Sequence, residues 1–219
     1  MKRCLLLSGG YGHDFAESSM ALSDLLCDAG WDCRIETDVH RAIAHLDDAD
    51  LLMVNGLWWS MTQDAKYAAD RDAFAFYLAD GDFRALLRHV VSGGSLFALH
   101  TATIAFDTQP EWKRLLGGGW TWGRSHHPPP GPLWIETHAP GLKAFAVVDE
   151  AYHHLDPAGD CTLFASCTLS DGPQPLAWTR TVGAGRVAVN ALGHNGASLR
   201  VPGHRALINA QLAWLENAA

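Results

Sequence analysis

The chain has 219 residues, of which 48% are hydrophobic and 18% are charged, and its formal net charge is −8. This composition supports a packed core, which excludes a disordered segment and predicts one domain over residues 1–219. The acidic balance, without a Lys/Arg-rich run, argues against nucleic acid or an anionic membrane as a partner. No apolar run is long enough to cross a bilayer. Five cysteines without a CxxC pair favour reduced thiols in the cytoplasm.

The first half of the chain alternates short buried strands with helices. We expect strands at 4–7, 31–37, 51–56 and 95–99. We expect helices at 18–29, 41–46 and 70–91, the last with a break near Asp80-Gly81. This alternation predicts a parallel sheet with right-handed crossovers. The loops that carry His13, Trp58 and His100 all follow strands, so we expect them at one edge of the sheet.

The second half of the chain has a different pattern, with more Gly and Pro and more closely spaced strands. The spacing predicts a helix at 110–116, then a loop over 117–130 where Gly and Pro are too dense for a regular element. Further strands are expected at 133–137, 145–148, 162–167, 176–180 and 186–192. An amphipathic helix over 204–217 closes the chain. The whole pattern indicates the α/β class.

Two histidines stand where buried strands end. The run from Gly93 to Ala102 contains an apolar strand that ends at His100, and Gly193-His194-Asn195 follows the strand at 186–192. The carboxyl edge of such a sheet is where ligands bind. An imidazole there can bind a metal or move a proton. The alternative is that each histidine is structural and hydrogen-bonded at a strand end.

The segment Asp149-Glu150-Ala151-Tyr152-His153-His154 places two carboxylates beside two imidazoles. Acid–base catalysis and metal binding both use such groups. In an extended chain Glu150, Tyr152 and His154 would share one face, and Asp149 and His153 the other. The pattern does not choose between His153 and His154, and a solvated polar turn is the alternative interpretation.

Loops supply the remaining candidates. Arg124-Ser125-His126-His127 lies in a loop that could cover a site, although loop histidines are more often simply solvated. Tryptophans such as Trp58, Trp120 and Trp122 usually pack in the core, but in glycine-rich loops they can stack on sugar rings. Gly9-Gly10-Tyr11-Gly12 lacks the GxGxxG spacing and the P-loop lysine, so no nucleotide cofactor is expected.

Eight stretches together resemble the ThuA-like (trehalose utilisation) family, a branch of the class I glutamine amidotransferase-like superfamily. They are Gly-His-Asp-Phe at 12–15, Gly-Gly-Ser-Leu-Phe-Ala-Leu-His-Thr-Ala at 93–102, Leu-Leu-Gly-Gly at 115–118, His-Ala-Pro-Gly-Leu at 138–142, Asp-Glu-Ala-Tyr-His at 149–153, Pro-Leu-Ala-Trp-Thr-Arg at 175–180, Gly-Ala-Gly-Arg-Val at 183–187 and Ala-Leu-Gly-His-Asn at 191–195. They keep the family's order over nearly the whole chain. The resemblance implies a flavodoxin-like three-layer sandwich with a mostly parallel central sheet and extra C-terminal strands.

The resemblance also implies a setting in sugar catabolism, with a sugar oxidoreductase as partner. His100 stands where the superfamily's amidotransferases carry a nucleophilic Cys, so glutamine amidotransferase activity is not expected. The chain departs from the family at Asn195, where Asp is common, and in a proline-rich insert at Pro128–Pro132. The first departure removes an acidic group from that position.

These observations lead to one main hypothesis, a carbohydrate-processing hydrolase or lyase that acts on a glycoside or keto sugar. Its catalytic residues are expected to be His100, Glu150 and His194, which are also the proposed ligands of a divalent metal, zinc or manganese. The expected substrate-binding residues are His13, Trp58, His126, Tyr152, His153 and Asn195. The alternative is a sugar-binding or regulatory module without catalysis, or a structural partner subunit. The sequence leaves self-association as a homo-oligomer open.

Overall fold

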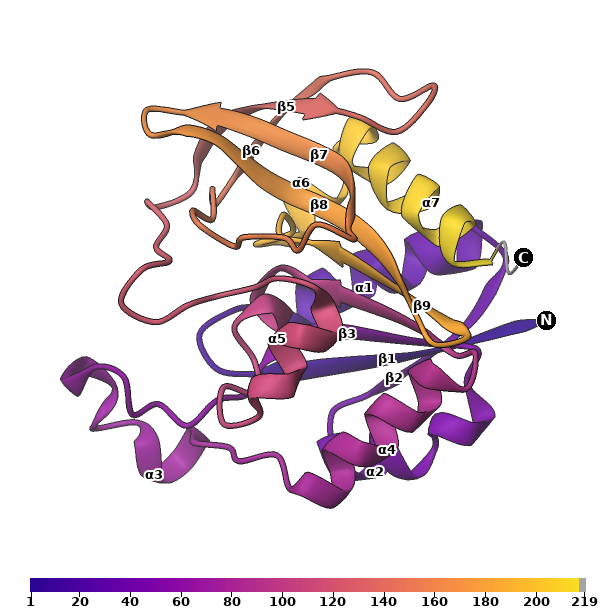
Figure 1. The fold of residues 1–219 in the computed structure, drawn as a ribbon, viewed down its shortest axis with the longest axis vertical. Helices are drawn as coiled ribbons and strands as arrows, with labels where there is room; N and C mark the ends of the chain where they lie inside the picture. Colours follow the sequence, from indigo (N-terminus) through magenta and orange to yellow (C-terminus); the bar gives the residue numbers. More distant parts are fainter. Residues whose placement is uncertain (217–219) are drawn as a thin grey trace.

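A computed structural model of the chain describes residues 1–216, and the end of the last expected helix, at residue 217, lies outside the described residues. Nine strands form one sheet in the order β2-β1-β3-β4-β9-β8-β7-β5-β6 (Figure 1). The strands are β1 (Lys2–Gly10), β2 (Trp31–Glu36), β3 (Leu51–Leu57), β4 (Ser95–Leu99), β5 (Gly131–Thr137), β6 (Phe145–Asp149), β7 (Thr162–Leu169), β8 (Gly172–Val182) and β9 (Gly185–Asn190). Every expected strand is confirmed.

The helices cover both faces of the sheet. They are α1 (Phe15–Asp28), α2 (Val39–Ala44), α3 (Arg71–Phe74), α4 (Asp80–Val91), α5 (Pro110–Leu116), α6 (Gly196–Leu199) and α7 (Pro202–Glu216), with short 3₁₀ helices η1 (Leu46–Asp48), η2 (Ala65–Tyr67) and η3 (His100–Thr103). The expected helix at 110–116 has the predicted bounds. The break within 70–91 lies at residues 75–79 rather than at Asp80-Gly81, since Asp80 is the first residue of α4. The single-turn helix α6 was not expected.

The sheet is mixed, so the expectation of a mostly parallel sheet is not confirmed. Strands β2, β1, β3, β4 and β9 pair in parallel. From β9 onward, the pairs β9–β8, β8–β7, β7–β5 and β5–β6 are antiparallel. The reason is the length of the connections, because two residues join β7 to β8 and two join β8 to β9. Links this short permit only hairpins, whereas a parallel crossover needs a dozen or more residues.

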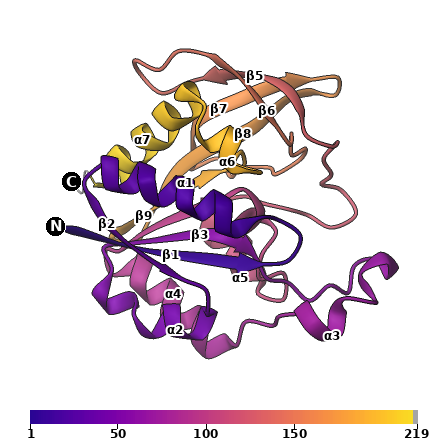
Figure 2. The same cartoon turned by 180° about the vertical axis from the view of Figure 1, so that it is seen from behind.

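Apolar side chains pack on both faces of the parallel strands. One face packs Leu6, Met53 and Phe97 against α1 and α7, and the opposite face packs Leu7, Val54 and Ala98 against α2, α4 and α5. The two sets of helices lie on opposite sides of the sheet, α4 and α5 toward the viewer in Figure 1 and α1 and α7 in Figure 2. The result is three layers. No helix within residues 1–216 is long and apolar enough to span a membrane.

Glycines let β1 and β3 approach closely near their carboxyl ends. Gly10 has a φ of +99°, and a Cβ there would lie 2.1 Å from the carbonyl oxygen of Leu57. A Cβ on Gly56 would lie 2.2 Å from the ring of Trp58. A larger residue at either position would push the strands apart. This close approach directs the chain after β1 into the loop that carries His13.

Candidate functional site

Four segments bring ionisable side chains together at the carboxyl edge of the parallel strands. His13 follows β1, His100 follows β4, His194 follows β9 and Glu150 follows β6. The ring centroid of His13 lies 5.3 Å from that of His100 and 4.9 Å from that of His194. Each of the four residues offers a ligand atom, and these atoms all lie within 4.8 Å of one another. In Figure 1 this edge is on the side opposite the N-terminus.

The backbone of His100 is held in an uncommon conformation. Its φ is +47°, a left-handed value that is strained for a residue with a side chain. Hydrogen bonds fix the turn: the Thr101 hydroxyl donates to the Gly56 carbonyl at 3.1 Å, and the Thr103 hydroxyl donates to the His100 carbonyl at 2.8 Å. The Trp112 indole donates to the Ala102 carbonyl at 2.9 Å. The strand end therefore presents the imidazole in one orientation.

The hydrogen bonds of His100 also set its tautomer. Nδ1 lies 2.8 Å from the Ala191 carbonyl, which can only accept, so Nδ1 carries the proton. Nε2 is then unprotonated and accepts a hydrogen bond from the Tyr152 hydroxyl at 3.2 Å. Oε2 of Glu150 lies 3.3 Å from the same nitrogen. Burial, Glu150 and Asp149 raise the pKa of Tyr152 well above its usual value, which keeps it a donor. An orienting bond to the far nitrogen is typical of metal-ligating histidines.

His13 completes the group with a neutral imidazole. Both of its ring nitrogens are buried, and neither makes a well-formed hydrogen bond among the described residues. Burial lowers the pKa of His13 to about 4, and the neighbouring His100 and His194 add to the effect. At neutral pH its ring is therefore uncharged and can offer a lone pair.

Glu150 lies between the histidines and is nearly buried. Its Oε1 is 3.4 Å from Nδ1 of His194 and 3.4 Å from Nδ1 of His127, which comes from the loop over 117–130. Burial raises the pKa of Glu150, but attraction to His100, His127 and His194 outweighs burial and holds that pKa below its usual value. The carboxylate is thus ionised at neutral pH.

Asp149 joins the two halves of the site, a role that sequence reasoning missed. Its carboxylate is buried and accepts the backbone N–H groups of Glu150 at 2.7 Å, Gly193 at 2.8 Å and His194 at 3.2 Å. It also accepts the Ser198 hydroxyl. One side chain therefore sets both the Glu150 and the His194 segments. The adjacent Asp149-Glu150 pair was the available signal, but alternation alone could not show what Asp149 contacts.

A cavity of about 360 Å³ opens beside these residues. Its walls are largely aromatic, and polar groups gather at one end. The lining residues are Tyr11, Gly12, His13, Leu57, Trp59, Lys66, Tyr67, Ile104, Trp120, Trp122, Ser125, His126, His127 and Tyr152. The size is in the range of small-molecule sites. Trp59, Tyr11 and Tyr67 are lining residues that were not among the expected site residues, and His127 was expected only as part of a loop that could cover a site.

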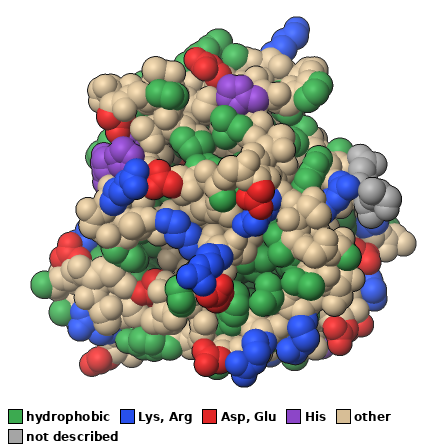
Figure 3. Space-filling model, in the orientation of Figure 1, with side chains coloured by type: hydrophobic (Ala, Val, Ile, Leu, Met, Phe, Trp, Pro, Cys, Tyr) green, Lys and Arg blue, Asp and Glu red, His purple; other side chains and the backbone are tan. Residues whose placement is uncertain are grey.

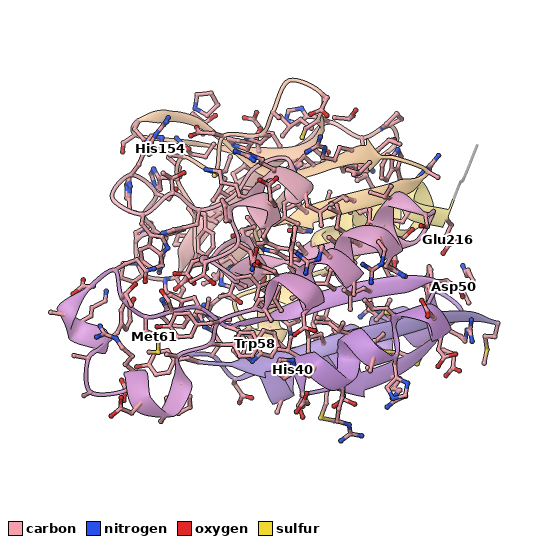
Figure 4. All side chains as sticks on the ribbon, turned by 60° about the horizontal axis from the view of Figure 1, so that its bottom comes forward. His40, Asp50, Trp58, Met61, His154 and Glu216 are labelled. Carbon is pink, nitrogen blue, oxygen red and sulfur yellow. The ribbon has the colours of Figure 1, made fainter. Side chains whose placement is uncertain are left out.

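The structure gathers some of the expected site residues and separates others. His13, His100, Glu150, Tyr152 and His194 come together, and His126 lines the cavity. Trp58 is buried outside the cavity, with its ring stacked on Phe106 at 6.2 Å. In Figure 4, Trp58 and His154 lie well apart.

Two further expected site residues have structural contacts. The Asn195 side chain accepts the Ser198 N–H at 3.0 Å and caps α6. His153 pairs with Asp171 at 2.8 Å, away from His100. His154 does not share a face with Glu150 and Tyr152, because its φ of +58° turns the chain and places its ring beside Asp171 as well.

The family model described as trehalose utilisation, ThuA, matches residues 3–215. The chain belongs to the ThuA family. Membership in this family indicates a sugar-related role. A ThuA-like protein from Parabacteroides merdae has a similar structure, with 17% sequence identity, a TM-score of 0.79 and coverage of 99% of this chain and 90% of that chain.

Two other solved structures show the same fold. A ThuA-like protein from Bacteroides uniformis has 14% identity and a TM-score of 0.74, covering 98% of this chain and 91% of that one. A protein from Salmonella typhimurium described as cytoplasmic has 12% identity and a TM-score of 0.65, covering 98% and 99%. The comparison with curated proteins gives no match. At these identities the ThuA-like structures establish the fold alone.

Proposed function

We propose that this ThuA protein is a carbohydrate-processing enzyme that cleaves a glycoside or keto glycoside by hydrolysis or elimination. One observation carries the proposal: buried, unsatisfied acceptor atoms of His13, His194 and Glu150 lie beside a cavity with aromatic walls. Sugar rings place their apolar faces on aromatic side chains, and their carbonyl and hydroxyl oxygens seek polar groups. The cavity offers both kinds of surface side by side.

The acceptor atoms fit a divalent transition metal. His13, His100, His194 and Glu150 would hold it, a mixed imidazole and carboxylate set that suits zinc or manganese. The ligand atoms of the four residues lie within 4.8 Å of one another. One Glu150 oxygen lies 3.3 Å from His100 Nε2, and the other lies 3.4 Å from His194 Nδ1. A lowered pKa makes Glu150 a weak base, which favours the ligand role.

The remaining residues would orient the sugar and move a proton. A bound metal would polarise the carbonyl of a keto sugar and acidify the adjacent C–H bond. His127 lines the cavity beside Glu150 and can accept that proton. The glycosidic C–O bond would then break as a double bond forms in the ring, and the departing oxygen would take the proton held by His127. Addition of water across that double bond would complete a hydrolysis. Trp59, Trp120 and Trp122 exclude water around the ring.

The setting of this activity is also part of the proposal. A keto glycoside would be formed by oxidation of a sugar hydroxyl, so a sugar oxidoreductase is the natural supplier of substrate. We place the reaction in the cytoplasm, as is said of the Salmonella neighbour. Neither nucleic acid nor a membrane has a part in it.

A chromogenic substrate tests the proposal. Metal-loaded protein should release 4-nitrophenol from 4-nitrophenyl 3-keto-glucoside, and His194→Ala should lose that release. His45→Ala is the matched control, because the His45 side chain is 40% exposed and its ion pair within residues 1–216 is with the exposed Asp48. Binding of keto sugars without release would favour the sugar-binding module instead. Neither binding nor release across a panel of keto glycosides would reject both.

A further inference from the structure

A second group of histidines lies beside the four-residue group described above, and one of its members, His126, also lines the cavity. His126, His153 and His154 offer ring nitrogens that all lie within 4.8 Å of one another. Asp171, in the turn between β7 and β8, adds a carboxylate: its Oδ2 lies 2.8 Å from His153 Nδ1 and 3.5 Å from His154 Nε2. None of these four residues contacts Glu150 in the ion pairs of the first site. The group thus stands as a separate set of ligand atoms.

Backbone geometry explains why these rings meet. His126 and His153 form an isolated antiparallel bridge, in which the His153 N–H donates to the His126 carbonyl at 2.9 Å. Their rings stack with centroids 4.2 Å apart. His154 has a left-handed φ of +58°, and its ring centroid lies 6.0 Å from that of His153. The main-chain bridge therefore brings together the two segments that carry these rings.

The loop over 117–130 serves both groups through two consecutive residues. Neighbouring side chains in an extended segment point to opposite faces. His127 accordingly faces Glu150, while His126 stacks on His153. The same loop carries Trp120 and Trp122, which line the cavity. Anything that fixes His126 therefore also fixes one wall of the cavity.

The chemistry of the second group suits a cation. Two imidazoles pair with the Asp171 carboxylate and a third, that of His126, stacks on His153. Imidazole in its neutral form has a lone pair to offer, so the set provides nitrogen and oxygen ligands of the kind zinc prefers. His153 is buried while His126 is exposed, which leaves a path for an ion from solvent. Histidine side chains reach the surface of the face drawn in Figure 3, among interspersed acidic and basic groups.

We propose that His126, His153, His154 and Asp171 form a second site for a divalent transition metal, with zinc the best fit, and that this site is structural. Occupancy would fasten the loop over 117–130 to the segment after β6. Hydrogen bonds already join the two: Gly119 N–H to the Leu155 carbonyl at 2.7 Å, and the Ser125 hydroxyl to the His154 carbonyl at 2.9 Å. The metal would add a strong link at the exposed end of the loop.

Zinc titration by calorimetry tests the proposal without reference to catalysis. In a background of His100→Ala with His194→Ala, which removes two of the four ligands of the first group, the protein should still bind one zinc ion. Adding His126→Ala, or separately His154→Gln, should weaken that binding by about 100-fold or more. The matched control is His138→Ala in the same background, because His138 is exposed and its ring bonds to the Ser166 hydroxyl rather than to either histidine group. Both test positions are at least partly exposed, so the variants should fold.

Hydrogen exchange tests the structural role. Zinc should slow amide exchange over residues 117–130 in the protein with His100→Ala and His194→Ala, and it should leave exchange there unchanged when His126→Ala is added. The proposal is overturned if zinc binding is the same with and without His126 and His154. It is equally overturned if zinc binds through these residues but amide exchange over residues 117–130 does not change, since the ion would then not stabilise the loop.

Discussion

The two halves of the sheet differ in how they are buried and in what they give the site. The central strands of the parallel half are covered on both faces, and every residue of β3 and β4 is buried. The antiparallel half leaves Trp134 and Val148 each 60% exposed near its edge. The parallel half supplies His13, His100 and His194 from strand ends, and the antiparallel half supplies Glu150. A rigid frame thus holds the imidazoles, and a second, more open sheet region brings the carboxylate to them.

The largest expected difference between the halves is in stability. Phe97 on β4 is fully buried, so Phe97→Ala should lower the free energy of unfolding by about 4 kcal/mol. Trp134→Ala on exposed β5 should change it by less than about 0.5 kcal/mol. Urea unfolding of chelator-treated protein measures both. Similar losses in the two variants would show that the antiparallel half is packed as tightly as the parallel half.

The second prediction asks whether the halves form one site. His100→Ala removes a group from the parallel half and Glu150→Gln one from the antiparallel half, and each should reduce 4-nitrophenol release by about 10²–10³-fold. Because both act on the same reacting group, the double variant should fall little further than either single variant. Full turnover in Glu150→Gln would assign catalysis to the parallel half alone.

The third prediction concerns the link between the halves. Asp149→Asn replaces a buried carboxylate that accepts N–H groups from both segments, and its amide NH₂ would face donors. We expect a loss of about 2 kcal/mol in unfolding free energy and weaker zinc binding at the first group. Asp24→Asn, at an exposed position, is the control and should change neither property. Unchanged zinc affinity in Asp149→Asn would mean that the two segments hold their places without Asp149.

The smallest effect is a pH dependence at His204, whose ring packs beside Phe145 of the antiparallel half. Burial lowers the pKa of His204, with Asp149 opposing the shift, so the folded state holds a neutral ring. The unfolded chain binds a proton there below about pH 6.5, so stability should fall as the pH falls below that value. His204→Gln should make the decline shallower by up to about 1.4 kcal/mol per pH unit. Urea unfolding at pH values from 7.5 to 5 measures the free energy of unfolding of both proteins. The same dependence on pH in the wild type and in His204→Gln would contradict this prediction.

The parallel half was the more predictable part of the molecule. Buried runs such as 51–56 and 95–99 are short, apolar and bounded by turn residues, so their strands and the histidine after β4 follow from local pattern. Helix α5 was found with its bounds because Pro110 begins it and Gly117, with a φ of +76°, ends it. These signals lie within a few residues of the element they define.

The antiparallel half depended on contacts that local pattern does not encode. Strand direction from β9 to β7 follows from two-residue turns, which the family resemblance did not reveal. The side of Glu150 and Tyr152 could be expected from alternation, but the left-handed His154 interrupts that alternation. His127 reaches Glu150 from 23 residues earlier in the chain, and no spacing rule links the two. Long-range packing decides such positions.

The left-handed turn at residue 100 has an evolutionary consequence. The bonds that hold this turn come from Thr101, Thr103 and Trp112, and none of them involves the His100 side chain. The side chain makes a separate bond to the Ala191 carbonyl. The backbone at residue 100 would therefore direct any side chain at this position to the same edge of the sheet. A single codon change at this position can exchange one reactive group for another while the fold is retained. Chemistry at this edge can diverge faster than architecture.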